Sequence, residues 1–218
     1  MTGPIERLLK DTTQVAVARL EDSVVSAIYE IDPKIVLHGG TAIWRCYGGQ
    51  RFSSDVDLYL TDSQVKRFNR ELTWKISKYD MKHDPASRNG REVRIFNDAA
   101  QTKLEAMRTP PRLKSVPALY ELSDGTRMAV RTLSVDDFIK EKMDTYLKRL
   151  YVRDFFDVYQ LVINHEVGPD IRKAVLSFID SAPKPKGVEV LRSIVYIGAA
   201  PTFADMVDSI HGRLNEIR

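Results

Sequence analysis

The chain has 218 residues, 43% of them hydrophobic and 29% charged, which is typical of one or two folded domains and excludes a disordered or fibrous protein. Its single cysteine, Cys46, excludes an internal disulfide and a zinc site built from several cysteines. No stretch reaches the roughly 18 apolar residues of a membrane helix, and the N-terminus lacks an apolar core of signal-peptide length. We therefore expect a cytoplasmic protein without a membrane partner.

The net charge of +3 is small, but basic residues are concentrated in one segment. Residues 63–114 contain 13 Lys or Arg against 6 Asp or Glu. Such a segment attracts polyanions, RNA among them, through counterion release whatever its fold. On charge alone, a solvated surface that is balanced by acids elsewhere is the simpler explanation.

The first part of the chain alternates helical and strand-like patterns. Apolar residues recur at helical spacing over 11–30, and Asp32-Pro33 ends that helix. The next expected elements are, in chain order, a strand at 35–37, a short helix at 42–47, a strand at 56–60 and a helix at 63–76.

The middle of the chain is rich in strand signals. Asn89-Gly90 and Asp124-Gly125 are turn signals of the kind that join neighbouring strands. The expected strands lie at 78–83, 92–96, 102–108, 119–122 and 128–130.

The hydrophobic period becomes helical at Ser134, which begins an S-x-x-D helix cap. Helices are expected at 134–150, 152–164, 169–179 and 201–217. The fold class is therefore α+β, with a mixed sheet flanked by helices in a domain over 1–132 and a helical domain over 133–218.

A double glycine, Gly39-Gly40, stands between a predicted strand and a predicted helix. This arrangement exposes backbone N–H groups to close approach by an anion, and Thr41 adds a hydroxyl. A tight turn without a ligand is the commoner reason for a glycine pair. No Gly-Lys-Ser/Thr follows, so the segment is not a Walker A loop, and the G-x-G-x-x-G of dinucleotide sites is absent.

Two aspartates, Asp55 and Asp57, stand at the start of the next predicted strand. Alternate strand residues face the same side, so both carboxylates can converge on one site. Near a phosphate cradle, such a pair suits a hard cation, Mg²⁺ or Mn²⁺, that bridges phosphate oxygens. Either feature alone is ordinarily structural, but their combination favours a metal and nucleotide site.

The segment GGTAIWRCYGGQRFSSDVDLYL resembles the first motif of the polymerase-β-like nucleotidyltransferase superfamily, a Gly-Gly or Gly-Ser turn followed by D-x-D. It looks most like the AbiEii/AbiGii toxin family, which includes the MenT toxins and has GGT-[AS]-[LI] followed by R-x-S-x-D-[ILV]-D-[LF]. The resemblance implies catalysis and metal binding by Asp55 and Asp57. It implies nucleotide binding by Gly39, Gly40, Thr41, Arg51, Ser53 and Ser54, with either serine matching the single one of the family.

A second segment, over residues 141–158, is similar to the family's K-[LM]-x-A-x-x-x-R-x-x-x-R-D-x-x-D-[ILV]. The resemblance implies that Lys142 contacts nucleotide phosphates as a catalytic residue, that Arg153 joins the nucleotide site and that Asp157 is catalytic. From the residues alone, Arg153 and Asp157 at i and i+4 can also form a structural ion pair, and Lys142 lies at the border of an apolar helix face. We favour function for Lys142 and Asp157 and a structural role for Arg149.

Members of the superfamily usually carry a third carboxylate on a later strand. Glu105, which has apolar neighbours on a predicted strand, is the first candidate for this third metal ligand, and Asp98 is its rival.

The resemblance implies a polymerase-β-type core whose active site is completed by the C-terminal helical domain. The expected enzyme transfers a nucleoside monophosphate from an NTP with Mg²⁺ or Mn²⁺. The resemblance also implies that the chain is the toxin of a toxin–antitoxin pair, with a cognate antitoxin protein as partner and the 3′ end of tRNA as acceptor.

Two other functions stay open. The same core could transfer a nucleotidyl or phosphoryl group to a protein hydroxyl, including Thr41, Ser53 or Ser54 of the chain itself. Alternatively, the chain could be a nucleotide-binding partner protein without turnover, although the presence of Asp55, Asp57 and Lys142 argues against this.

Overall fold

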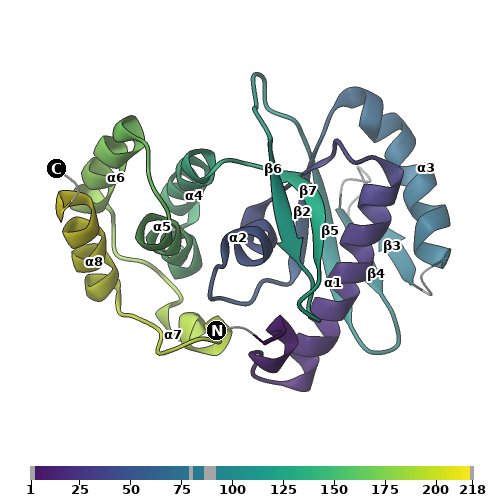
Figure 1. Cartoon of the computed structure of the whole chain (residues 1–218), viewed down its shortest axis with the longest axis horizontal. Coiled ribbons are helices and arrows are strands. Elements are labelled where there is room, and N and C mark those ends of the chain that lie inside the picture. Colours follow the sequence, from purple (N-terminus) through teal and green to yellow (C-terminus); the bar gives the residue numbers. More distant parts are fainter. Residues whose placement is uncertain (1–2, 79–80, 86–91, 217–218) are drawn as a thin grey trace. The chain divides into compact units, whose positions relative to one another are not determined.

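The structure is a computed structural model that describes residues 3–78, 81–85 and 92–216 (Figure 1). The chain divides into two units, of which the first comprises Met1–Cys46 and Phe52–Leu133 and the second Tyr47–Arg51 and Ser134–Arg218. The short segment Tyr47–Arg51, which lies inside the range expected for the first domain, therefore belongs to the helical unit.

A seven-stranded mixed sheet forms the centre of the first unit, in the order β3-β4-β5-β2-β1-β7-β6. β1 pairs antiparallel with β2 and parallel with β7, and β2 pairs parallel with β5. The strands are β1 (Val36–His38), β2 (Asp55–Leu60), β3 (Lys82–Pro85), β4 (Glu92–Phe96), β5 (Gln101–Arg108), β6 (Val116–Glu121) and β7 (Arg127–Thr132). The expected mixed sheet is confirmed.

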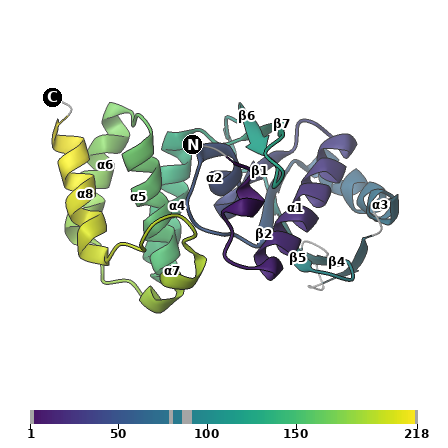
Figure 2. The ribbon, with the colours of Figure 1, turned by 60° about the horizontal axis from the view of Figure 1, so that its bottom comes forward.

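The helices of the first unit are η1 (Ile5–Arg7), α1 (Thr12–Ile31), α2 (Gly39–Tyr47, whose last residue opens the segment Tyr47–Arg51) and α3 (Asp62–Lys78). Asp11 caps α1, because its carboxylate accepts a hydrogen bond of 2.8 Å from the backbone N–H of Gln14. The helix ends at Ile31, just before the expected break at Asp32-Pro33. Both views of the ribbon show α1 beside α3 (Figures 1 and 2).

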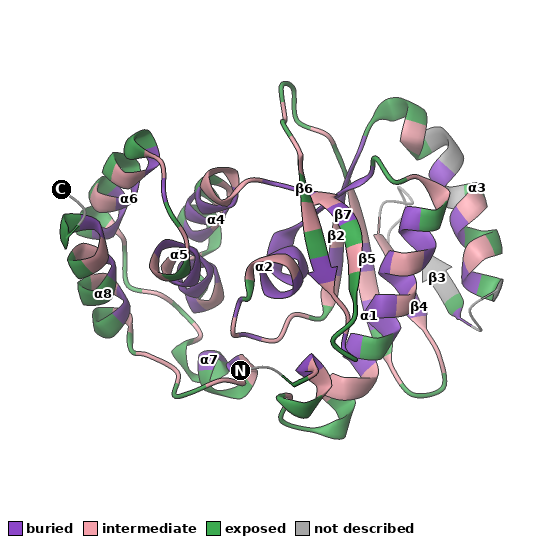
Figure 3. Cartoon of the chain, in the orientation of Figure 1, coloured by how far each residue is buried: buried purple, intermediate pink, exposed green. Residues whose placement is uncertain are grey.

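The second unit is helical, and α5 is its central element. Its helices are α4 (Val135–Arg149), α5 (Val152–Asn164), α6 (Pro169–Ser181), α7 (Val188–Ile194) and α8 (Phe203–Glu216). α5 is buried on most of its circumference (Figure 3), as expected for a helix that packs against α4, α7 and α8. The S-x-x-D cap is also present, because the Ser134 hydroxyl accepts from the Asp137 backbone N–H.

The structure departs from the expected elements in a few places. α3 runs to Lys78 and β3 begins at Lys82, so the strand expected at 78–83 is only partly present. α7 was not expected, because seven residues are too few to display a helical period. The turn expected at Asn89-Gly90 lies outside the described residues. Within the described ranges, no helix is both long enough and apolar enough to cross a bilayer.

Candidate active site

The two halves of the first motif meet at Gly39 and Asp57. Gly39 begins α2 with a φ of +73°, a backbone conformation that favours glycine. A Cβ atom at Gly39 would lie only 2.0 Å from Oδ2 of Asp57 and 2.8 Å from its Cγ. The Asp57 carboxylate therefore occupies the space that a side chain at position 39 would need. Glycine is required at this point for two independent reasons.

Thr41 ties the first turn of α2 to the start of β2. Its hydroxyl, which is fully buried, donates a hydrogen bond of 2.6 Å to the backbone carbonyl of Asp55. The sequence predicted that Thr41 binds nucleotide. In the structure its hydroxyl proton is used to hold the turn and the strand together, so the backbone rather than the side chain is what this turn offers to an anion.

Asp55 and Asp57 lie on one face of β2, and both are half-buried. Val56, Leu58 and Leu60 alternate with them and are buried on the other face, at no more than 1% exposure. The sheet register places Lys103 of β5 opposite Asp55, and Glu105 opposite Asp57. The expected convergence of two carboxylates on one face is thus present in the backbone geometry.

Lys103 is a cation that the sequence did not point to. Its Nζ lies 3.1 Å from the Glu105 carboxylate. Burial lowers the pKa of Lys103, but Glu105, Asp55 and Asp57 together raise it above its ordinary value. The strand alternation puts Lys103 and Glu105 on one face, but only the parallel pairing of β5 with β2 shows which carboxylates they face.

The donor chemistry fits a divalent cation that is shared with a substrate. In the described part of the chain, no three His, Cys, Asp or Glu side chains are grouped as a complete protein cage for a metal ion. Mg²⁺ needs no such cage, because it is usually held by one or two carboxylates together with water and substrate phosphates. Asp55 and Asp57 are two such carboxylates, and that of Asp57 lies directly against the backbone of Gly39.

The two rivals for a third carboxylate have different positions. Glu105 is opposite Asp57 on the adjacent strand, but its carboxylate is engaged by Lys103. Asp98 is exposed in the β4–β5 turn, where Asn97 accepts hydrogen bonds from the backbone of Ala99 and Ala100. Of the two, only Glu105 lies opposite the aspartate pair.

A small hollow lies beside Asp55. Its volume is about 190 Å³, and it is lined by Ser54, Asp55, Arg94, Gln101, Thr102 and Lys103. The Thr102 hydroxyl donates to the Ser54 carbonyl at 2.7 Å, which fixes the chain just before β2. Ser54 is exposed and Ser53 half-buried. Two cationic side chains, Arg94 and Lys103, thus line the same hollow as a half-buried carboxylate, which is a suitable environment for phosphate groups.

A buried carboxyl group, Glu21 of α1, lies behind this site. Glu21 is fully buried, and neither of its carboxyl oxygens makes a hydrogen bond of ordinary geometry among the described residues, although the Thr41 hydroxyl is near enough to lower the pKa of Glu21. Burial raises the pKa of Glu21 well above its ordinary value, Asp22 and Asp55 raise it further, and Arg45 opposes them. The raised pKa favours the protonated form of Glu21. The sequence did not predict the burial of Glu21, because the residue lies in the middle of an ordinary amphipathic helix.

The second motif forms a buried ion-pair cluster within the helical unit. Arg51 binds Asp157 through two parallel hydrogen bonds, Nε to Oδ1 at 2.6 Å and Nη2 to Oδ2 at 2.7 Å. Lys142 places its Nζ 2.9 Å from the same carboxylate and 3.7 Å from Asp154. Arg51, Lys142 and Asp157 are all buried. The predicted nucleotide contact Arg51 is thus a partner of the predicted catalytic residue Asp157.

The cluster continues to Arg149. Its guanidinium binds the fully buried Asp154 through hydrogen bonds of 2.7 and 2.8 Å. Burial raises the pKa of Asp157, but Arg51 and Lys142 outweigh this effect and hold it below the ordinary value. Asp157 therefore pairs with Arg51 and Lys142, not with Arg153 as the i, i+4 spacing suggested.

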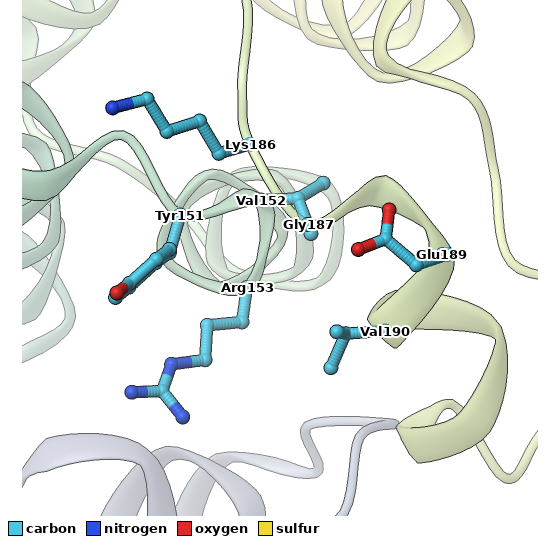
Figure 4. Close-up of a pocket in the computed structure, with 7 residues that line it drawn as sticks. All are labelled: Tyr151, Val152, Arg153, Lys186, Gly187, Glu189 and Val190. Carbon is cyan, nitrogen blue, oxygen red and sulfur yellow. The ribbon is translucent and has the colours of Figure 1, made fainter.

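Arg153 lies elsewhere on α5. Its guanidinium is 5.5 Å from the ring centre of Tyr151, in a pocket that α7 and the residues before it complete (Figure 4). The sequence predicted Arg153 as a nucleotide contact but did not single out Tyr151.

The comparisons with known proteins identify the family of the chain. Residues 26–203 match the sequence profile of the family described as "Nucleotidyl transferase AbiEii toxin, Type IV TA system". The chain belongs to the AbiEii family. Both motifs lie inside the matched range. No protein with a curated description matches the chain in sequence.

Two solved structures show that the AbiEii chain shares its fold with other proteins. JHP933 from Helicobacter pylori is 16% identical, with a TM-score of 0.63 over 95% of this chain and 92% of JHP933. An H. pylori protein provisionally described as a nucleotidyltransferase is also 16% identical, with a TM-score of 0.60 over 95% of this chain and 96% of its own. At such low identity the likeness establishes the fold, a nucleotidyltransferase-like sheet with C-terminal helices.

Proposed function

We propose that this AbiEii chain transfers a nucleoside monophosphate from an NTP to the 3′ end of an RNA, with tRNA as the acceptor, as the toxin of a toxin–antitoxin pair. The observation that carries the proposal is the contact between Gly39 and Asp57. It brings the glycine turn and the D-x-D strand together, and these are the two parts that nucleotidyl transfer needs.

The residues of the first unit have separate roles in this proposal. The backbone N–H groups at the start of α2 bind the NTP phosphates, and Arg94 and Lys103 add positive charge in the hollow beside Asp55. Asp55 and Asp57 would hold Mg²⁺ or Mn²⁺, which when bound neutralises phosphate charge and makes the acceptor hydroxyl more acidic.

The reaction is a substitution at the α-phosphorus. The 3′ hydroxyl oxygen of the acceptor forms a new bond to that phosphorus, and the bond from the phosphorus to the bridging oxygen of the β-phosphate breaks. Pyrophosphate leaves with that oxygen. A carboxylate of the aspartate pair accepts the hydrogen bond of the attacking hydroxyl and takes up its proton. Holding the reacting atoms in line supplies most of the catalysis.

Lys142 is the proposed phosphate contact of the helical unit. Three cations, Arg51, Lys142 and Arg149, share the carboxylates of Asp154 and Asp157. The five residues therefore carry one positive charge in excess, which a phosphate can balance. Asp157 and Arg51 position Lys142 in this account, and Asp157 keeps its negative charge because its pKa is lowered.

Two features support the RNA acceptor and the partner. The basic segment 63–114 suits a polyanion, and Arg94 and Arg112 are exposed within it. The family's description as a toxin of a type IV system supports a cognate antitoxin protein.

The test uses each of the four NTPs, labelled at the α-phosphate, with Mg²⁺ and total tRNA. The proposal predicts label on RNA, removable by a 3′ exonuclease, and dependent on Asp57. Label on the protein would instead support transfer to Thr41, Ser53 or Ser54. No label with any NTP would contradict nucleotidyl transfer, and a repeat with NTP labelled at the γ-phosphate would then separate phosphoryl transfer to the protein from a partner protein without turnover.

A further inference from the structure

The helical unit exposes a large aromatic side chain, Tyr151, that does not belong to its core. Tyr151 precedes α5 and is 46% exposed, and its phenol makes no hydrogen bond in the described part of the chain. The ring is flanked by two guanidinium groups, with Arg149 at 5.6 Å and Arg153 at 5.5 Å from its centre. The ring and the two guanidinium groups together form a flat aromatic surface with positive charge beside it.

The surface belongs to a pocket with a volume of about 520 Å³, within the range of roughly 300–1,000 Å³ that small-ligand sites occupy. Its lining residues are Tyr151, Val152, Arg153, Lys186, Gly187, Glu189 and Val190. Figure 4 shows Tyr151 and Arg153 on the side of α5, and Glu189 and Val190 on the side of α7. Val190 is 46% exposed, so both sides carry exposed apolar surface.

The backbone fixes the two sides of the pocket in register. The Lys186 N–H donates to the Leu150 carbonyl at 2.7 Å, and the Val152 N–H donates to the Lys186 carbonyl at 3.0 Å. Leu150 adopts a left-handed conformation with a φ of 58°, which turns the chain sharply between α4 and α5. The pocket is therefore built by paired segments and does not depend on a ligand to form it.

The charges of the pocket favour an anion with an attached aromatic group. No ion pair within the described part of the chain uses Arg153 or Lys186, so both charges are available to a ligand. The N-terminal end of α5 lies at the same place and adds its positive dipole end. Glu189 is the single acid that lines the pocket, and it is exposed.

We infer that this pocket binds one unpaired nucleotide of the RNA acceptor. Its base stacks on the Tyr151 ring. The Arg153 and Lys186 side chains, which extend to opposite sides of that ring (Figure 4), contact the phosphates before and after the base. Unpaired RNA bases are commonly bound in this way, by stacking on aromatic rings and arginine planes. Glu189 accepts a hydrogen bond from an exocyclic amino group, so cytosine, adenine or guanine is preferred to uracil, which has no such group. The inference rests on the proposed function, because RNA is the acceptor only in that account.

The test measures RNA binding without NTP and without Mg²⁺, so it does not depend on catalysis. The probes are fluorescein-labelled single-stranded octamers of oligo(C), oligo(A) and oligo(U), titrated by anisotropy over a series of salt concentrations. The variants are Tyr151→Ala, Tyr151→Phe, Arg153→Ala, Lys186→Ala and Glu189→Gln. Lys173→Ala removes an exposed charge from α6 as the matched control.

Loss of the ring in Tyr151→Ala should weaken binding of oligo(C) about tenfold, the scale of one lost stacking contact. Tyr151→Phe keeps the ring and should bind within about twofold of wild type. Arg153→Ala and Lys186→Ala should each reduce the salt slope by about one. Glu189→Gln should reduce the preference for oligo(C) and oligo(A) over oligo(U), and Lys173→Ala should match wild type.

Three results would overturn the inference. If Tyr151→Ala binds RNA as tightly as wild type, and the wild type still binds and labels RNA, the pocket is not an RNA-binding site, but the proposed function is unaffected. A higher KM for NTP in Tyr151→Ala, without a change in RNA affinity, would assign the pocket to the NTP base. A wild type that binds none of the RNAs would overturn both the inference and the RNA acceptor.

Discussion

Gly39 is the residue at which the candidate site tolerates least change. Its positive φ disfavours any side chain, and a Cβ atom there would fall on the Asp57 carboxylate. Gly48 offers a comparison, because its φ is +67° but nothing lies within 4 Å of a Cβ built on it.

We predict that Gly39→Ala abolishes nucleotidyl transfer, since Asp57 must move to admit the methyl group. Gly48→Ala should share the backbone strain, about 1–2 kcal/mol, yet keep most of the activity. The comparison needs label transfer and urea unfolding for both variants. Equal activity in the two variants would show that the contact between Gly39 and Asp57 has no catalytic importance.

Glu21 gives a prediction about pH. Because burial raises the pKa of this carboxyl, the folded protein keeps the proton after the unfolded chain has released it. Its contribution to stability is therefore fully present below the ordinary pKa of 4.5 and decreases as the pH rises toward the raised value.

Glu21→Gln removes this titration. The variant should gain stability relative to wild type between pH 5 and 8, and the two should converge near pH 4. Urea unfolding at a series of pH values measures the difference, with the exposed Glu166→Gln as control. Parallel stability curves for wild type and Glu21→Gln would mean that Glu21 is charged in the folded protein.

At the scale of elements, the pairing of Arg51 with Asp157 connects the segment Tyr47–Arg51 to α5. Arg51→Met should lower the free energy of unfolding by about 3–5 kcal/mol. The Asp157 carboxylate stays buried in this variant and keeps only one of its two cationic partners, Lys142. The double variant Arg51→Met/Asp157→Leu should recover much of this loss. Lys173→Met, an exposed change in α6, should be nearly neutral. A loss in Arg51→Met as small as in Lys173→Met would contradict the buried pair.

Lys142 should behave differently from Arg51. Lys142→Met removes the excess positive charge but leaves Arg51 paired with Asp157 and Arg149 paired with Asp154. We predict a smaller loss of stability than in Arg51→Met, together with a loss of transfer on the order of 10²-fold, as for other electrostatic stabilisers. Activity per folded molecule is the quantity to compare. If it is intact in Lys142→Met while stability falls as far as in Arg51→Met, Lys142 is structural.

The sequence predicted the regular elements better than the contacts between them. Helices with caps or clear periods, such as α1 behind Asp11 and α4 behind Ser134, carry local signals that a sequence displays. The seven-residue α7 has no room for a period, and Tyr151 is one aromatic residue among nine tyrosines. The partners of Asp157 could not be predicted, since Arg51 is 106 residues away in the chain.

For the protein as a whole, the proposed activity depends on a pair of carboxylates whose mutual repulsion a bound cation relieves. Asp55 and Asp57 share one face of β2 and face Lys103 and Glu105. In the absence of metal, removing one negative charge should leave the fold as stable as wild type or more so. With Mg-NTP bound, the wild type should gain stability by ligand linkage, and a variant without the site should not.

The most direct test compares Asp57→Asn with wild type and with Asp144→Asn, the same chemical change at an exposed position of α4. Thermal unfolding with and without Mg-NTP is measured alongside transfer of the α-phosphate label. We predict that Asp57→Asn has no transfer activity, an unchanged or higher melting temperature without Mg-NTP, and little of the wild-type gain with it, whereas Asp144→Asn behaves as wild type. An Asp57→Asn protein that still transfers nucleotide would contradict the assignment of the active site.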